Sequence, residues 1–120
     1  MKEELQMSAL KVSMFQLMES SRIGLTKLSG KSAINGNKKS INTLILEAID
    51  QYLELSLELQ IPPPFLGPWK AFTIRMPDSK KRAILNVCGH LQIKNGLPIS
   101  MSAALNSAIY LYLKKHSVKV

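Results

Sequence analysis

Lys70-Ala71-Phe72-Thr73-Ile74-Arg75-Met76-Pro77 is the stretch of this sequence with the clearest strand pattern. Large apolar side chains alternate with small or polar ones along it: Phe72, Ile74 and Met76 against Ala71, Thr73 and Arg75. This is the period of a strand with one buried and one open face. Pro77 and Asp78 then end the strand and start a helix. Because a lone strand leaves its backbone groups unpaired, this segment needs a second strand, from the same chain or from another copy.

A repeat of the same pattern supplies that strand. Residues 9 to 15 form a weaker alternating segment, in which Leu10, Val12 and Met14 alternate with Lys11 and Ser13. Helix-periodic segments follow each strand, over 18–33 and 40–58 in the first half and over 78–93 and 100–116 in the second. Shifting the chain by 60 residues aligns the halves without a gap and gives nine identities in the 45 pairs from Ala9 to Leu53. The repeat therefore predicts that the two strands pair within one chain.

Glycine and proline mark the boundaries between these segments. Asn35-Gly36 and Asn95-Gly96 each stand between two helix-periodic segments, so we interpret each glycine as a left-handed cap that ends a helix. Four of the six prolines lie between Ile61 and Trp69, which predicts a stiff linker. The sequence thus predicts a first repeat over 9–58, a linker over 59–69 and a second repeat over 70–116, intertwined in one mainly α domain with a two-stranded antiparallel ribbon.

The net charge of +8 lies entirely in the second half. Residues 1–60 hold seven basic and seven acidic side chains, whereas residues 61–120 hold nine basic side chains and only Asp78. Such asymmetry favours a polyanionic partner, with nucleic acid first and an anionic membrane surface second, although a charged surface that aids solubility explains the same counts.

Signals for catalysis, metals and membranes are missing from the sequence. The two histidines, His90 and His116, and the single Cys88 do not form a set with ligand spacing, and no glycine-rich phosphate loop occurs. No apolar run approaches the roughly 20 residues that span a bilayer. We therefore expect no enzymatic activity, metal, cofactor, small-molecule substrate or membrane partner. A lone cysteine favours a reducing, cytoplasmic location, with the protein on the nucleoid if it binds DNA.

The second helix of each half carries a resemblance to a known family. In the first half this helix opens with Ser40 and closes on Ala-Ile-x-x-Tyr-Leu. The segment reads Lys39-Ser40-Ile41-Asn42-Thr43-Leu44-Ile45-Leu46-Glu47-Ala48-Ile49-Asp50-Gln51-Tyr52-Leu53. The second half keeps much of this motif: Ser100, Ser102, Leu105, Ala108, Ile109, Tyr112 and Leu113. Strand, helix, turn and helix in this order resemble the ribbon-helix-helix family of DNA-binding proteins. Because both strands lie in one chain, the sequence is similar to tandem, TraY-type members of that family.

The resemblance implies a tandem ribbon-helix-helix pseudo-dimer (β-α-α-linker-β-α-α) that places its ribbon in the major groove of double-stranded DNA. The implied base-reading residues on the open face are Lys11, Ser13, Ala71, Thr73 and Arg75. Phe15 does not fit a polar reading position; it could contact a thymine methyl group, pack under a neighbouring chain, or show that the strand ends early. Leu17 stands where the family has a proline.

Phosphate contacts are expected at the start of each second helix, where unpaired backbone amides attract anions. The residues concerned are Lys38, Lys39, Ser40, Asn42, Ser100 and Ser102. Ser40 and Ser100 also fit the role of ordinary N-caps, and the two roles are compatible.

The function expected from these features is that of a transcriptional repressor or an accessory DNA-binding protein of a plasmid or other mobile element. Self-association of chains on adjacent DNA sites is also expected. The alternatives are an antitoxin-type autoregulator and a helical interaction module that binds an acidic partner.

Overall fold

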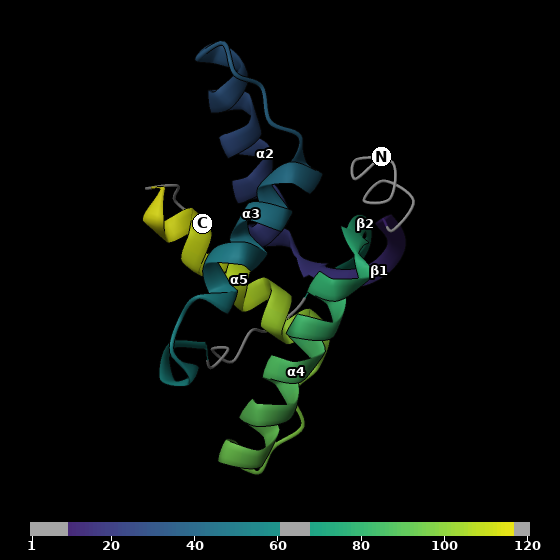
Figure 1. Cartoon of the computed structure of the whole chain (residues 1–120). Coiled ribbons are helices and arrows are strands. Elements are labelled where there is room, and N and C mark those ends of the chain that lie inside the picture. Colours follow the sequence, from purple (N-terminus) through teal and green to yellow (C-terminus); the bar gives the residue numbers. More distant parts are fainter. Residues whose placement is uncertain (1–9, 61–67, 117–120) are drawn as a thin grey trace.

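The computed structural model describes residues 10–60 and 68–116. Its elements follow in the order β1 (Leu10–Met18), α2 (Glu19–Ile34), α3 (Ile41–Leu53), the short 3-10 helix η1 (Leu57–Gln60), β2 (Trp69–Pro77), α4 (Asp78–Asn95) and α5 (Met101–Lys115). The described part of the chain is thus mostly helical and contains one two-stranded antiparallel sheet (Figure 1). The order β-α-α-β-α-α matches the tandem layout expected from the repeat.

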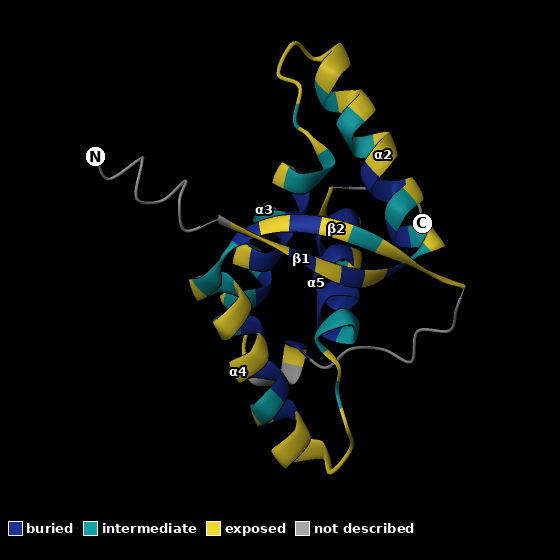
Figure 2. Ribbon diagram, turned by 90° about the vertical axis from the view of Figure 1, so that its right-hand side faces the viewer, coloured by how far each residue is buried: buried dark blue, intermediate teal, exposed yellow. Residues whose placement is uncertain are grey.

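The two strands cross one face of the molecule, with α3 and α5 behind them (Figure 2). Their register pairs Leu10 with Pro77 at one end and Met18 with Trp69 at the other. The partner of the 70–77 strand therefore comes from the same chain, about 60 residues earlier.

The core lies between the sheet and the pair α3 and α5, which pack against each other. Each of these helices buries a stripe of side chains spaced three or four residues apart, as in Ile45, Ala48 and Ile49 of α3. The corresponding stripe of α5 is Leu105, Ala108 and Ile109. Each fully buried isoleucine or leucine contributes about 1.5–3 kcal/mol of hydrophobic stabilisation. α2 and α4 pack less extensively and extend toward opposite ends of the molecule (Figure 1).

Glycine ends both of these extended helices. Gly36 and Gly96 have φ angles of 80° and 68°, which confirms the interpretation of the two Asn-Gly pairs as helix ends. No helix within residues 10–60 and 68–116 has the length and apolarity needed to cross a bilayer.

The predicted fold class, a regular tandem ribbon-helix-helix pseudo-dimer with a gap-free repeat, is wrong as stated. The two halves do not correspond at one constant shift. Buried Phe15 and Leu17 occupy the inner positions that Ile74 and Met76 occupy in β2, and Glu19 starts α2 as Asp78 starts α4, all at a shift of 59. The N-caps Ser40 and Ser100 correspond at a shift of 60. α4 has 18 residues against 16 in α2, and the connection to the next helix has five residues (96–100) against six (35–40), which leaves one additional residue in the second half.

The change of shift reverses the predicted faces of the first strand. Ser13, Phe15 and Leu17 are 7%, 4% and 0% exposed, whereas Val12 and Met14 are 63% and 70% exposed. Phe15 packs into the core of its own chain, so none of the three explanations considered for it holds. β1 also continues to Met18, which stands where Pro77 stands in the second half.

One described element lies across a predicted boundary. η1 begins in the segment assigned to the first repeat and ends inside the predicted linker. Residues 61–67, most of that linker, lie outside the described residues, as does Ala9 at the predicted start of the first repeat.

Candidate nucleic-acid interface

The exposed face of the sheet, called the outer face below, carries three side chains from each strand. They are Val12, Met14 and Gln16 from β1 and Ala71, Thr73 and Arg75 from β2, all exposed (Figure 2). Across the strands Val12 pairs with Arg75, Met14 with Thr73, and Gln16 with Ala71. Along β2 the outer face therefore presents polar Thr73 and Arg75 beside Ala71, and along β1 it presents apolar Val12 and Met14 beside polar Gln16.

The predicted reading residues of the two strands lie in different places. Ala71, Thr73 and Arg75 lie together on the outer face. Ser13 does not, since it faces Ile74 on the inner side and its Oγ has no hydrogen-bond partner in the described part of the chain. Its predicted exposure is therefore wrong.

Lys11 lies two residues before Ser13 and therefore on the same, inner side of β1. Its side chain is nevertheless exposed, because the sheet ends beside it. It lies near the start of α4, where the Arg82 guanidinium bonds the Asp78 carboxylate at 2.7 Å from Nε to Oδ2. That hydrogen bond, together with the charges of Arg82, Lys11 and Lys81, holds the pKa of Asp78 below its ordinary value. Lys11 thus contributes positive charge at one end of the sheet.

Sequence reasoning missed Gln16, which takes the place assigned to Ser13 as the polar outer-face residue of β1. The signal was present in the pairs Met18-Glu19 and Pro77-Asp78, which end both strands at a shift of 59. Counting back from these pairs makes Gln16 the counterpart of Arg75.

Asn42 near the start of α3 and Ser102 near the start of α5 make hydrogen bonds to the two edges of the sheet. The Asn42 side chain accepts a hydrogen bond from the Arg75 amide at 2.8 Å and donates one to the Arg75 carbonyl at 3.0 Å. Ser102 Oγ accepts from the Gln16 amide at 3.0 Å. Each contact joins the second helix of one half to the strand of the other half. The starts of α3 and α5 therefore flank the sheet on its two edges.

Ser40 and Ser100 are N-caps, as one of the two interpretations predicted. Their side-chain oxygens accept from the amides of Thr43 and Ala103 at 3.1 and 3.0 Å. Lys38 is exposed just before the first of these caps. Lys39 lies between Ser32 and Glu47: its amide donates to Ser32 Oγ at 2.9 Å and its Nζ to Glu47 Oε1 at 2.7 Å. Its charge is thus shared with a carboxylate of its own chain.

Asn106 is the second structural residue that sequence reasoning missed. Its side chain is 0% exposed, and its oxygen and its nitrogen each make two hydrogen bonds. Oδ1 accepts from the Met18 amide and from Ser21 Oγ, both at 3.0 Å. Nδ2 donates to the carbonyls of Gln16 at 2.8 Å and Ser102 at 2.7 Å. The available signal was a polar residue inside the apolar stripe of the last helix, a pattern that calls for buried partners.

None of the family models, curated proteins or solved structures compared with this chain matches it. The resemblance to the ribbon-helix-helix family therefore stays a prediction from the sequence. The geometry of the outer face and its flanking helices is the basis for a functional proposal.

Proposed function

We propose that this protein binds double-stranded DNA by placing the outer face of its two-stranded sheet in the major groove. The observation that carries the proposal is the exposure of six adjacent outer-face side chains beside the starts of α3 and α5. A major groove about 12 Å wide admits a two-stranded ribbon and presents a pattern of donors and acceptors that identifies each base pair.

The chemistry of the outer face suits base recognition. Arg75 can donate two hydrogen bonds to guanine, and the Gln16 amide can pair with adenine in the same bidentate way. Val12, Met14 and Ala71 offer apolar contact to thymine methyl groups. Thr73 adds a hydroxyl that donates or accepts. The outer-face side chains of β1 differ from those of β2, so the preferred DNA site is expected to be asymmetric.

The helix starts suit phosphate binding. Each α-helix leaves its first backbone amides without intrahelical partners and has a positive dipole end, so a phosphate is stabilised there. Ser40 and Ser100 mark these starts, with Lys38 and Lys39 before the first. Asn42 and Ser102 position the helices against the sheet, and this replaces the direct phosphate contact expected of them.

The biological role that fits this binding is that of a repressor or an accessory protein of a mobile element, acting without catalysis. Cooperative binding of several chains to adjacent sites belongs to the same proposal. Lys11 contributes charge at the end of the sheet in this arrangement, while Ser13 has no part in it.

Selection of bound sequences from random duplex DNA, followed by titration of the selected duplex, tests the proposal. If roughly four phosphates are neutralised, the affinity is expected to fall by about 100-fold between about 50 and 200 mM salt. Arg75→Ala is expected to weaken binding to the selected site by about 5- to 150-fold and to relax the preference at one base pair.

Lys94→Ala is the matched control, because it removes the same charge from the exposed far end of α4. It should reduce affinity only slightly and leave the sequence preference intact. Equal effects of the two substitutions, or no sequence enrichment at all, would contradict base reading by the outer face. If the protein does not bind duplex DNA but binds an acidic protein strongly, the alternative of a protein-interaction module is favoured instead.

A further inference from the structure

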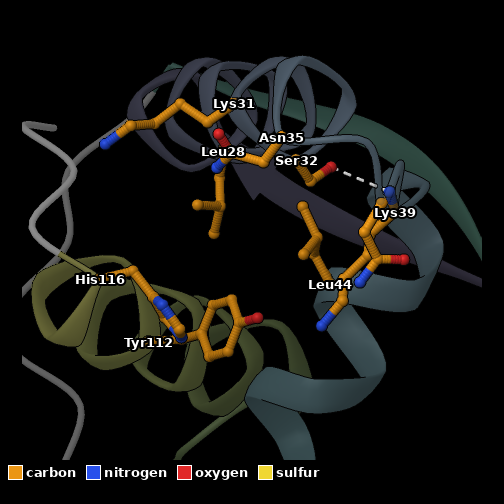
Figure 3. Close-up of a pocket in the computed structure, with 9 residues that line it drawn as sticks. Leu28, Lys31, Ser32, Asn35, Lys39, Leu44, Tyr112 and His116 are labelled. Atoms are coloured by element: carbon orange, nitrogen blue, oxygen red, sulfur yellow. Dashed lines mark hydrogen bonds between the residues drawn. The ribbon is translucent and has the colours of Figure 1, made fainter.

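A cavity of about 320 Å³ lies between the end of α2, the turn before α3 and the end of α5 (Figure 3). Three side chains supply its apolar lining: Leu28 points from α2 toward α5, and Leu44 and the Tyr112 ring line the opposite sides. Ser32, Asn35 and Asn37 add polar groups to the lining. The Tyr112 and His116 rings lie 4.4 Å apart between centroids, and their planes are tilted by 54° against each other. The volume lies at the lower end of the range of small-ligand pockets, about 300–1,000 Å³.

The rim of the cavity carries one lysine that is not paired with a carboxylate in the described part of the chain. Lys31, Lys39 and His116 line the cavity, and no acidic side chain is among its described lining residues. The nearest carboxylate, Glu47, has both oxygens engaged, since Oε1 accepts from Lys39 at 2.7 Å and Oε2 from the Tyr112 hydroxyl at 3.0 Å. Glu47 is thus compensated inside the chain, while Lys31 remains exposed at the mouth of the cavity.

The turn that forms one wall is held by its own hydrogen bonds. Ser29 Oγ donates to the Lys39 carbonyl at 2.7 Å, and the Lys39 amide donates to Ser32 Oγ at 2.9 Å. Ser32 Oγ also donates to the Ser29 carbonyl at 2.7 Å. The cavity is therefore preformed, which reduces the entropy that a ligand must lose in order to bind.

The second half of the molecule fills the equivalent space with protein. The equivalents of the cavity walls are α4, the start of α5 and the end of α3, and η1 packs on α4 and α5. Gln60 of η1 is 5% exposed and donates from Nε2 to the Tyr52 carbonyl at 2.9 Å, while its own carbonyl accepts from the Tyr52 hydroxyl. Tyr112 is the counterpart of Tyr52, but its hydroxyl bonds Glu47 and leaves the space beside it open.

We propose that this cavity is a binding site for a small organic carboxylate with an apolar body. The body lies between Leu28, Leu44 and the Tyr112 ring, and the carboxylate meets the Lys31 ammonium group at the rim. The site is separate from the outer face, and its occupation requires no DNA.

Titration of the protein alone with sodium benzoate, followed by amide resonances in two-dimensional NMR, tests this site. Ionic strength is held constant with chloride. The expected result is saturable shifts centred on Leu28, Lys31 and Tyr112, with a dissociation constant on the order of 1 mM, as befits a ligand of this size. Benzyl alcohol, which has the same ring without the charge, should bind several-fold more weakly.

Lys31→Gln should weaken benzoate binding by about three- to tenfold, the value of one partly screened ion pair. Lys27→Gln is the matched control, because Lys27 is exposed on the same helix one turn away and does not line the cavity. Shifts that do not saturate, that centre on another surface, or that respond equally to both substitutions would overturn the proposal.

Discussion

Asn106→Ala is expected to be among the most destabilising single polar substitutions in this chain. The side chain is fully buried and makes hydrogen bonds to the Met18 amide, the Gln16 carbonyl and Ser21 Oγ. Each bond contributes about 1 kcal/mol net, and a buried partner left unpaired costs about 1–3 kcal/mol. Alanine recovers roughly 0.6 kcal/mol through its higher helix propensity. The net loss in the free energy of unfolding is therefore about 2–4 kcal/mol.

Urea denaturation followed by circular dichroism measures this loss. Asn86→Ala is the control, because Asn86 is exposed in the middle of α4 and gains the same helix propensity. Asn86→Ala should be neutral or slightly stabilising. If Asn106→Ala costs less than about 1 kcal/mol relative to it, the buried network does not secure β1 as described, because even a single lost bond would account for that much.

Three further substitutions and one pH series test other parts of the fold. Gly30→Ala should raise the free energy of unfolding by about 0.5–1 kcal/mol, since its Cβ would meet open space. Gly24→Ala should gain less or lose stability, because its Cβ would clash with Leu113 Cδ1. Equal gains from the two substitutions would contradict the close packing of α2 on α5. Burial, and for Tyr112 also the bond to Glu47, raises the pKa of both Tyr52 and Tyr112 to about 12. Above pH 10 the unfolded chain therefore releases phenolic protons that the folded chain keeps, so the free energy of unfolding should fall as the pH rises from 10 to 12. Urea titrations across this range should show a smaller fall for Tyr112→Phe, and an unchanged slope would refute the burial of that hydroxyl.

The second strand was predictable because only one of its faces is apolar. Ile74 and Met76 have polar or small neighbours on both sides, so a single choice of inner face exists. The first strand offers two apolar sets, one ending in Met14 and the other containing Phe15 and Leu17. Local alternation cannot choose between such sets, and the constant shift of 60 selected the wrong one.

In the candidate site, too, the residues of the second strand were predictable and those of the first strand were not. Ala71, Thr73 and Arg75 follow from the pattern of their own strand, whereas Gln16 depends on where β1 ends. The roles of Asn42 and Asn106 depend on which strand each helix start meets in the folded chain. These contacts join residues 33 and 90 positions apart, as in the bonds from Asn42 to Arg75 and from Asn106 to Gln16, and no local pattern reports on them.

The start of each second helix contacts the strand of the other half, and this has a consequence for synthesis of the chain on the ribosome. β1 obtains its strand partner only when β2 has been made, and its edge is secured only by Ser102 and Asn106. At about 5–20 residues per second, the translation of the intervening residues takes on the order of 5–20 seconds. During that interval Phe15 and Leu17 lack the core residues that the second half of the chain supplies. The first half therefore completes its packing only after the second half has been synthesised.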